Sequence, residues 1–460
     1  MKISIENFKS IRQLHEFEIK PMTILSGVNS SGKSSFIQFL LLLKQSLEKS
    51  STKEVLDLNG KYFKTKNYEE IIYLKNHDND IEFKISFYDK WGSLPPLLRS
   101  LGFEIINAKV IFSFSSNKLG IKSLELGVSS SNQELKKFLH VTKNDNDTYK
   151  IEADSDEFGK GIWNKNIHAS IQFNSIYPLT WEVTESLESE FGEFDKKTIN
   201  AFNISWIKNG IDSVFENIYY IGPARVKPKE IYNENGDSIY VGSDGKYTAQ
   251  IMHDLASEEV ASRKLIEEDT TFRYEALNGE LLDVINYWLC DYFGIGGEIY
   301  AKKENDNFKI FLQNENDLEV NIRHVGYGIS QILPIIVQGL LLAKGQTLII
   351  EQPELHLHPK LQSKLYDFLY SLTLKEVKVI VETHSSHFIT RMRRRIAEDL
   401  SNEMDDNINL TFIENGVFST LEIDDYAVMN YYPEDFIESY ETEISALIQA
   451  QMNKRLKRND

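Results

Sequence analysis

The sequence is poor in cysteine, with Cys290 alone among 460 residues. A single thiol cannot form an intrachain disulfide, so a disulfide-stapled framework is excluded and a reducing compartment is expected. The chain opens Met1-Lys2-Ile3-Ser4-Ile5, without a charged-then-apolar leader. Its longest apolar run, residues 332–343, contains Pro334 and Gln338 and is too short to cross a bilayer. We therefore expect a soluble, cytoplasmic protein with no membrane contact.

Basic side chains are in the minority, since 51 Lys and Arg stand against 69 Asp and Glu for a net charge of −18. An acidic chain repels polyphosphate at long range, so contact with nucleic acid requires a local basic patch or a basic partner. Two runs are candidates for such a patch, Arg391 to Arg395 and Lys454 to Arg458. Each run is also compatible with a solvated helix face that keeps the protein soluble.

Internal repeats, low-complexity segments and linkers rich in Pro, Gly or Ser are all missing. At roughly 100–200 residues per domain, the length predicts two or three structural units. Because no linker marks a boundary, we expect the middle of the chain to be inserted into one nucleotide-binding fold. The predicted parts are an N-terminal part of the head at 1–180, an insertion at 181–306, a C-terminal part of the head at 307–400 and an extension at 401–460.

Residues 27–34 read Gly-Val-Asn-Ser-Ser-Gly-Lys-Ser, which is the pattern G-x-x-x-x-G-K-S without departure. An apolar strand ending at Leu25 precedes this loop and an apolar helix from Lys33 towards Lys49 follows it. The glycines let successive N–H groups and the positive helix end face a chain of phosphates. Lys33 is expected to reach the β- and γ-phosphates, and the Ser34 hydroxyl to hold Mg²⁺. The loop predicts binding of ATP and Mg²⁺ through Gly27, Asn29, Ser30, Ser31, Gly32, Lys33, Ser34 and Ser35.

Hydrophobic periodicity predicts strands on both sides of a more helical middle region. Residues 2–8 and 15–25 alternate like a half-buried hairpin, and an antiparallel region follows the phosphate loop. Its predicted strands are 81–88, 109–115, 121–128, 149–153 and 169–173. From about 187 to 293 the period lengthens, which predicts a mainly helical insertion with helices at 195–216, 247–266 and 281–293. Strands at 308–312 and 318–323 follow.

A second helix start is predicted behind Gly326 and Gly328. Proline is tolerated in a first helical turn, so Pro334 predicts that the helix running to Ala343 begins near Ser330. Ser330 would then be an N-cap, and the free N–H groups of this helix end could meet an anion. A purely structural cap is equally compatible with the pattern.

An arginine follows a third short strand. The run Tyr219-Tyr220-Ile221 ends at a Gly-Pro turn, and Arg225 lies just beyond it. A guanidinium at a strand end could meet a phosphate, but a surface arginine is equally compatible with the sequence.

The strand predicted at 347–350 ends in Glu351-Gln352-Pro353-Glu354. Acids at the end of a strand beside a phosphate loop are typical of a Walker B motif, in which one carboxylate holds Mg²⁺ and another activates the attacking water. Glu351 is the predicted metal ligand. The pair His356 and His358 is not expected to bind zinc, because only Glu354 lies nearby and no cysteine helps.

A further predicted strand, 377–381, ends at Glu382-Thr383-His384. A neutral imidazole at this position could hydrogen-bond a γ-phosphate or its attacking water. His384 is therefore a candidate site residue, although a lone histidine is more often structural.

The order of these motifs resembles that of the ABC-type ATPase heads of the SMC, RecF and OLD group. The likeness is carried by Asn7-Phe8-Lys9-Ser10-Ile11, by the phosphate loop and by residues 351–359. It extends to prokaryotic predicted ATPases with a short C-terminal extension through residues 220–223, 241–245, 328–334 and 382–385. ATPase subunits of Septu-type anti-phage systems look similar. The resemblance implies an α/β head with a mixed β-sheet and an inserted, largely helical subdomain.

In such heads two subunits sandwich ATP. The resemblance implies that Lys33, Ser34, Glu351 and His384 come from one subunit and Gly328 and Ser330 from the other. ATP binding then joins the subunits and hydrolysis releases them.

One residue departs from the pattern, because most ABC heads place a glutamate base directly after the Mg²⁺ acid. Here that position is Gln352, whose amide cannot accept a proton. Either Glu354 takes over as the base, or hydrolysis is slow and the ATP-bound state is long-lived. We favour slow hydrolysis.

The resemblance implies an ATP-gated homodimer or higher homo-oligomer that controls an effector, such as a nuclease, in defence against phage. OLD nucleases append a metal-binding Toprim domain, whereas after His384 only the acidic pair Asp424-Asp425 stands out. We therefore expect a nuclease, if there is one, to be a partner protein. The alternative is a DNA-repair or DNA-tethering head, but residues 90–310 show no sustained heptads of the coiled coil that it needs.

Overall fold

The computed structural model describes residues 1–28, 31–48, 54–76, 78–90, 92–115, 118–130, 133–144, 148–153, 167–183, 188–189, 192–193, 205–234, 239–314, 316–431 and 433. The predicted site residues Asn29 and Ser30 and the basic run 454–458 lie outside these ranges. The chain forms two compact units. The first comprises Met1–Ile19, Ser34–Ile218 and Asn415–Val417, and the second comprises Lys20–Lys33, Tyr219–Glu414 and Phe418–Asp460. The four-part division remains a prediction.

The first unit contains a nine-stranded antiparallel sheet in the order β10-β9-β8-β7-β6-β5-β4-β1-β2. The strands are β1 (Lys2–Phe8), β2 (Ile11–Glu18), β4 (Ile81–Tyr88), β5 (Ile105–Ser115), β6 (Lys118–Ser130), β7 (Gln133–Lys143), β8 (Tyr149–Ala153), β9 (Ile167–Asn174) and β10 (Tyr177–Val183). The predicted antiparallel region is confirmed. Two of its strands, β7 and β10, were not predicted, and they are defined by their pairing with neighbouring strands.

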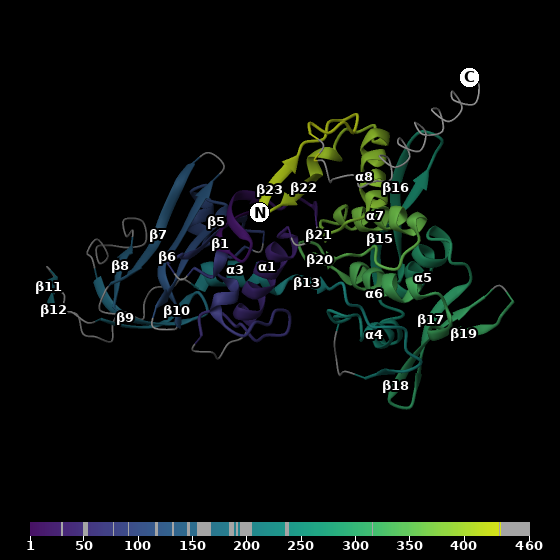
Figure 1. The fold of residues 1–460 in the computed structure, drawn as a ribbon, viewed down its shortest axis with the longest axis horizontal. Coiled ribbons are helices and arrows are strands. Elements are labelled where there is room, and N and C mark those ends of the chain that lie inside the picture. Colours follow the sequence, from purple (N-terminus) through teal and green to yellow (C-terminus); the bar gives the residue numbers. More distant parts are fainter. Residues whose placement is uncertain are drawn as a thin grey trace, which may run out of the picture. The chain divides into compact units, whose positions relative to one another are not determined.

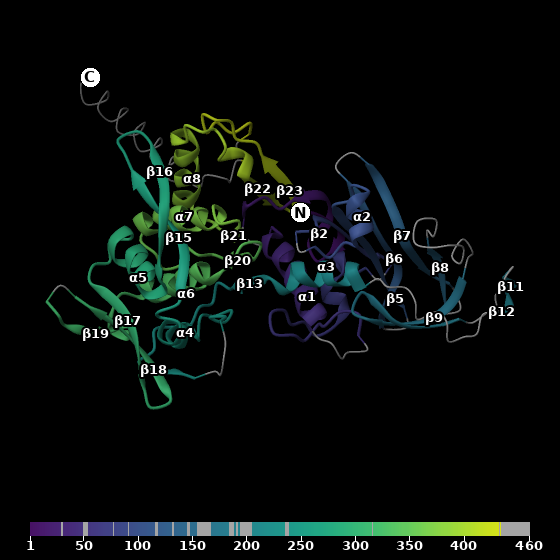
Figure 2. The same cartoon turned by 180° about the vertical axis from the view of Figure 1, so that it is seen from behind.

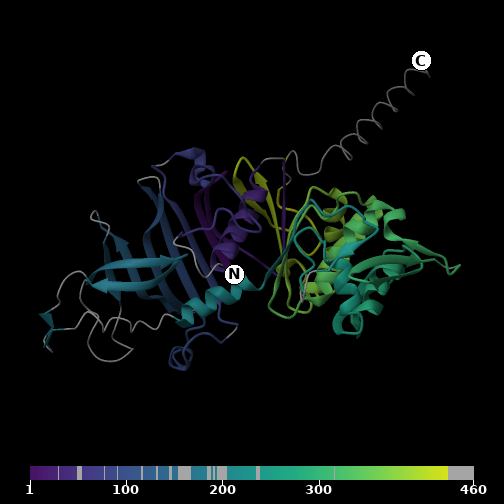
Figure 3. The same ribbon diagram turned by 90° about the horizontal axis from the view of Figure 1, so that it is seen from below.

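Helices lie against this sheet in the first unit (Figure 3). The first unit contains α1 (Lys33–Glu48), α2 (Pro96–Ser100) and α3 (Ser205–Glu216), with short 3₁₀ turns η1 (Tyr68–Ile71) and η2 (Tyr73–Lys75) and strands β11 (Glu188–Ser189) and β12 (Gly192–Glu193). The ring of Phe39 on α1 lies 5.2 Å from that of Phe8 and 5.6 Å from that of Phe83. Lys44 of α1 donates to the Phe215 carbonyl of α3 over 3.1 Å. Helix α3 covers the described part of the helix predicted at 195–216, and residues 195–204 lie outside the described ranges.

The second unit is built on a six-stranded sheet in the order β13-β20-β21-β3-β22-β23. Its strands are β3 (Met22–Gly27), β13 (Ile218–Ile221), β20 (Thr347–Glu351), β21 (Lys378–Glu382), β22 (Ile408–Glu414) and β23 (Val417–Leu421). Strands β20, β21, β3 and β22 are parallel neighbours. Every residue of β3 and β20 is buried, as expected for parallel strands covered on both faces. The predicted strand 15–25 is therefore wrong as one element, because its two halves are β2 and β3 in different sheets.

Helices and smaller sheets surround this second sheet. The helices are α4 (Thr248–Asp254), α5 (Leu281–Asn286), the π-helical η3 (Tyr287–Tyr292), α6 (Tyr327–Leu341), α7 (Pro359–Thr373) and α8 (Ser386–Glu398), with 3₁₀ turns η4 (Ile322–His324) and η5 (Asp405–Asn407). The strands are β14 (Tyr232–Asn233), β15 (Glu259–Glu267), β16 (Phe272–Glu280), β17 (Glu298–Glu304), β18 (Asn307–Gln313) and β19 (Glu319–Asn321). The β15–β16 hairpin runs beside α7 and α8 (Figures 1 and 2). Among the described residues, no helix combines the length and apolarity needed to cross a bilayer.

The helix predicted at 247–266 is wrong, because α4 ends at Asp254 and β15 begins at Glu259. Strand β15 pairs with β16 from Glu259↔Glu280 to Glu267↔Phe272. This pairing forms a hairpin whose second strand lies outside the segment 247–266, so the period of that segment alone cannot reveal it. The described part of 181–306 thus contains strands as well as helices and is not largely helical. The broader prediction of an α/β fold with mixed sheets is confirmed.

The predicted start of α6 is also wrong. The helix begins at Tyr327 behind Gly326, so Pro334 lies in its interior and Ser330 is not an N-cap. Proline there removes the bond to the Ser330 carbonyl, at a cost of about 3 kcal/mol. Residues 330–340 are all buried, and this packing offsets the lost hydrogen bond.

Candidate functional site

The phosphate loop begins where β3 ends, at Gly27. This residue has φ of 141°, and a Cβ at this position would lie 2.1 Å from the carbonyl oxygen of Ile413. Ile413 is the register partner of Gly27 on the adjacent strand β22. Only glycine fits here, because both the backbone conformation and the neighbouring strand exclude a side chain.

Lys33 is the first residue of α1, at the end of the phosphate loop, and is only 3% exposed. Its Nζ donates to the carbonyls of Gly27 over 3.0 Å and of Val28 over 2.7 Å. Burial lowers the pKa of Lys33, and the charges of Glu382 and Glu354 raise it. Burial is the larger effect, so the pKa of Lys33 is lowered overall, and the two carbonyls hold its Nζ at the end of the loop.

A hydroxyl in the same loop lacks a hydrogen bond. Ser31 Oγ is buried and has no partner within the ranges that the structure describes. A buried hydroxyl without a partner costs free energy, and an acceptor such as a phosphate oxygen would satisfy it. Ser31, Lys33 and the start of α1 therefore fit the phosphates of a nucleotide.

The ends of β20 and β21 lie next to the end of β3. Glu351 is opposite Glu382 in register, and Glu382 is opposite Leu25. The N–H of Thr383 donates to the Leu25 carbonyl over 3.0 Å. The sheet order thus brings the acidic turn 351–354, the segment 382–384 and the start of the phosphate loop to one edge.

Glu351 is 8% exposed and accepts a hydrogen bond from Tyr220. The Tyr220 hydroxyl lies 2.7 Å from Glu351 Oε1 and comes from β13, the neighbour of β20. Burial raises the pKa of Glu351, and the bond from Tyr220 lowers it. Sequence reasoning did not identify Tyr220 as a site residue, because its partner lies 131 positions away.

Glu354 reaches the segment that follows β21. Its Oε1 accepts the main-chain N–H of His384 over 2.7 Å. Its Oε2 is buried and has no hydrogen-bond partner in the described part of the chain. Burial raises the pKa of Glu354, whereas the His384 N–H lowers it. One carboxylate oxygen is therefore fixed and the other is open to a further donor, such as a water molecule.

Arg225 is 5% exposed, so of the two alternatives left open by the sequence that of a surface arginine is excluded. Its Nη2 donates to the Gln352 carbonyl over 2.8 Å, and Nη1 approaches those of Gly222 and Glu351 at 3.4 Å. Burial lowers the pKa of Arg225 to about 10, and the charge of Glu354 raises it.

Helices α7 and α8 begin directly beyond these turns. Ser385 caps α8 by accepting the Phe388 N–H over 3.1 Å. Gln362 on α7 accepts the Ser385 hydroxyl over 2.6 Å and donates to the Leu357 carbonyl over 2.9 Å. Its amide therefore ties the segment after Glu354 to the segment after His384.

The two histidines of the His-x-His pair have structural contacts. His358 caps α7, with Nδ1 3.3 Å from the Lys360 nitrogen. The His356 ring lies edge-on against Tyr327, with centroids 4.7 Å apart. Within the described ranges, no group of three or more His, Cys, Asp and Glu side chains is arranged to hold a metal ion. Mg²⁺ needs fewer protein ligands, because water and phosphate oxygens complete its shell.

The first turn of α6 lies against the segment that follows β20. A Cβ on Gly328 would lie 3.1 Å from the His356 carbonyl oxygen. Ser330 is buried, and its hydroxyl donates to the Tyr327 carbonyl over 2.7 Å. The remaining predicted residues, Ser34 and Ser35, belong to the first unit, where Ser35 Oγ lies 2.8 Å from Ser10 Oγ.

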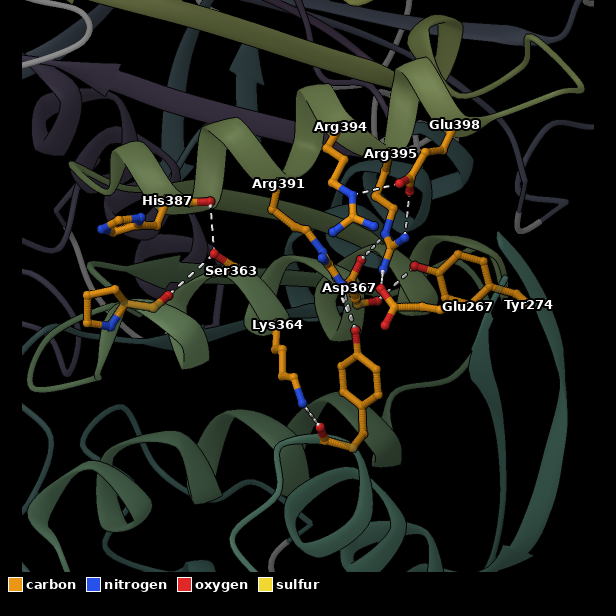
Figure 4. Close-up of polar contacts among 12 residues, drawn as sticks. Glu267, Tyr274, Ser363, Lys364, Asp367, His387, Arg391, Arg394, Arg395 and Glu398 are labelled. Carbon is orange, nitrogen blue, oxygen red and sulfur yellow. Dashed lines mark hydrogen bonds and ion pairs between the residues drawn. The ribbon is translucent and has the colours of Figure 1, made fainter. Parts of the chain in front are cut away.

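The basic run 391–395 is engaged with carboxylates (Figure 4). Arg391 and Arg395 on α8 both pair with Asp367 on α7 and with Glu267 at the end of β15. Arg394 and Arg395 also pair with Glu398. These pairs give the prediction of a nucleic-acid patch at this run little support.

Comparisons with known proteins agree with an ATPase. A family model described as AAA ATPase domain matches residues 1–389. No curated protein matches the chain.

Three solved structures of SMC heads are similar, each at 11% identity. One is an SmcHead bound to the C-winged helix domain of ScpA, where the match covers 92% of this chain and 97% of that chain with a TM-score of 0.42. Another is an SMC head domain from Thermotoga maritima, where it covers 92% of this chain and 98% of that chain with a TM-score of 0.33. The third is an Smc head domain with an extended coiled coil bound to the C-terminal domain of ScpA derived from Pyrococcus furiosus, where it covers 98% of this chain and 98% of that chain with a TM-score of 0.40. The family model spans most of the sequence and includes every predicted site residue. The chain belongs to the AAA ATPase domain family and is an ATPase.

Proposed function

We propose that this ATPase hydrolyses ATP slowly and acts as an ATP-gated homo-oligomeric switch for an effector protein, a nuclease being the favoured class, in prokaryotic anti-phage defence. The observation that carries the proposal is Gln352, an amide at the position directly after the predicted Mg²⁺ acid. A side chain that cannot accept a proton prolongs the ATP-bound state, which suits a switch better than a motor.

The residues of the loop would bind the triphosphate. Lys33 would transfer its hydrogen bonds from the Gly27 and Val28 carbonyls to phosphate oxygens. Ser31 Oγ, which has no partner among the described residues, would gain one. Ser34 and Glu351 would hold Mg²⁺, which supplies charge neutralisation when bound. Release of the Tyr220 hydroxyl would free Glu351 Oε1 for this role.

Glu354 is the base that we propose, in place of Gln352. Its Oε1 is fixed by the His384 N–H, and its Oε2 is buried without a hydrogen-bond partner among the described residues. A carboxylate held in this way can take a proton from water. Its position three residues beyond Glu351, instead of directly after it, is consistent with slow turnover.

Single-site variants test this assignment. Glu354→Gln should reduce the turnover of ATP at least about a hundredfold while ATP affinity is kept, because removal of a general base costs ~10²–10⁴-fold. Gln352→Glu restores an acid at the usual position. If Glu354→Gln hydrolysed ATP at the wild-type rate and Gln352→Glu greatly accelerated hydrolysis, Glu354 would not be the base.

A homo-oligomer would place the first turn of α6 against the nucleotide of another copy. Gly328 would contribute to this surface, in which the free N–H groups at a helix start face the phosphates. Ser330 is buried, so its hydroxyl would have to leave the Tyr327 carbonyl to join this contact. ATP would then hold the copies together, and hydrolysis would release them.

The assembly is tested by light scattering after size exclusion, without nucleotide and with ATP and Mg²⁺. We expect a larger species only with ATP, and Lys33→Ala as the control should stay in the nucleotide-free state. An unchanged mass in wild type that demonstrably binds ATP would refute the ATP-gated assembly.

Capture of the tagged chain from its native host identifies the effector. A co-purifying nuclease supports the switch, whereas DNA alone supports the second candidate, a DNA-repair or DNA-tethering head. No specific observation favours that second candidate, because Arg391, Arg394 and Arg395 are paired with carboxylates.

A further inference from the structure

Arg225 is a buried cation in an unusual environment. No carboxylate lies within ion-pair distance of it in the ranges that the structure describes, and its Nε is buried without a hydrogen-bond partner there. Its hydrogen bonds all run to main-chain carbonyls, those of Gly222, Glu351 and Gln352. Burying an arginine in this way is costly, so the contacts that it makes need an explanation.

The target of Arg225 is a strained turn. Gln352 has φ of 45°, a left-handed conformation that is uncommon for a residue with a side chain. Its N–H donates to the Glu382 carbonyl over 2.7 Å, and its carbonyl accepts Arg225 Nη2 over 2.8 Å. The peptide groups on both sides of this residue are thus fixed, one by β21 and one by the guanidinium.

The conformation of Gln352 determines where Glu354 lies. A reversal immediately after β20 turns the chain back, and Glu354 then meets the His384 N–H beyond the neighbouring strand β21. An extended residue at 352 would continue the direction of β20 and carry Glu354 away from this contact. Such strained residues persist only when surrounding groups hold them.

We propose that Arg225 is a positioning residue that holds the turn 351–354 in its left-handed form and thereby sets Glu354 for water activation. This inference rests on the proposed role of Glu354 and adds a residue that acts through it. Arginine suits the task because its planar fork binds two neighbouring carbonyls at once, which a lysine ammonium on a flexible stem cannot do in the same geometry.

The first test uses hydrogen–deuterium exchange without nucleotide. In Arg225→Lys, the peptide that covers residues 347–358 should exchange at least about tenfold faster than in wild type, since the Gln352 N–H bond to Glu382 loses its support. Arg323→Lys is the matched control, because Arg323 belongs to the same unit but forms an exposed pair with Glu230. Equal exchange in Arg225→Lys and wild type would overturn the proposal.

The second test separates positioning from nucleotide contact. A misplaced base lowers kcat by ~10–100-fold, since small displacements at a reacting group are costly, and leaves affinity for a fluorescent ATP analogue within about twofold. If Arg225→Lys instead weakened binding of the analogue and kept kcat, Arg225 would be a phosphate ligand and the proposal would be wrong.

A chemical-rescue experiment distinguishes loss of the guanidinium from general damage to the fold. Arg225→Ala should regain part of its kcat when millimolar methylguanidinium is added, as this cation can occupy the space of the missing side chain. No rescue in a variant that keeps its circular dichroism spectrum and ATP affinity would count against the proposal. If wild type itself neither bound nor hydrolysed ATP, the proposed function would fail, whereas the exchange experiment would still decide whether Arg225 holds the turn.

Discussion

The ion-pair network between α7, α8 and β15 should be the most sensitive polar feature of the second unit (Figure 4). Asp367 is fully buried, and so is its partner Arg395. Asp367 Oδ1 accepts Arg395 Nε over 2.7 Å, and Oδ2 accepts Arg391 Nε over 2.8 Å together with the Tyr292 hydroxyl. Both carboxylate oxygens are therefore committed to cationic donors.

The substitution Asp367→Asn keeps the shape of this side chain and removes its charge. One oxygen becomes an NH₂ group, which faces a guanidinium donor instead of accepting from it. Breaking a buried pair from one side costs about 3–5 kcal/mol, because the remaining charge is left without compensation. Glu267 and Glu398 still pair with Arg395, so we expect the lower end of that range, about 3 kcal/mol.

Denaturation measured by fluorescence of Trp288 reports on this unit. Its ring lies 5.1 Å from that of Phe368, the residue next to Asp367 on α7. For a unit of this size, each kcal/mol shifts Tm by ~2–4 °C, so Asp367→Asn should melt roughly 6–12 °C below wild type.

The exposed pair Lys302–Glu319 provides the control. Its side chains are 46% and 43% exposed, so Glu319→Gln should leave the free energy of unfolding close to that of wild type. If Asp367→Asn lost less than about 1 kcal/mol of unfolding free energy, as little as this control, a buried charge without compensation would not determine the size of the destabilisation.

Three further predictions follow from single residues. Gly27→Ala should lose ATP binding and at least ~2 kcal/mol of stability, because its Cβ would lie 2.1 Å from the Ile413 oxygen, whereas Gly294→Ala, with φ of 77° and open space around it, should cost only about 1 kcal/mol by urea denaturation. Burial lowers the pKa of Lys375 from 10.5 to about 8, so the folded state binds fewer protons than the unfolded state between these pH values. Wild type should therefore gain up to ~3 kcal/mol of stability relative to Lys375→Met as pH rises through this window. A difference in unfolding free energy between the two proteins that did not change with pH would contradict the lowered pKa of Lys375. Burial raises the pKa of Cys290 to about 11, so a thiol reagent at pH 8 should label the folded protein far more slowly than the denatured one, and equal rates would show that this segment is open.

The sequence alone determined the elements whose signals are local. The phosphate loop is recognisable because its glycines, Lys33 and flanking elements lie within about thirty residues of one another. Strands β20 and β21 are short apolar runs that can only be buried, and the polar residues after them identify Glu351, Glu354 and His384 as candidates. The ATPase activity that the resemblance implied agrees with the AAA ATPase domain match over residues 1–389.

Folding decided the features that depend on partners outside the segment itself. Residues 259–267 form a strand because Phe272 to Glu280 pair with them, although their own period fits a helix. Helix α6 continues through Pro334 because burial of its whole middle offsets one missing hydrogen bond. Arg225 is buried because its acceptors, the carbonyls of residues 351 and 352, lie more than a hundred positions along the chain. A one-dimensional pattern records which side chains are present and how they are spaced, but only the folded chain brings such distant donors and acceptors together, and the free energy of those contacts overrides local preference.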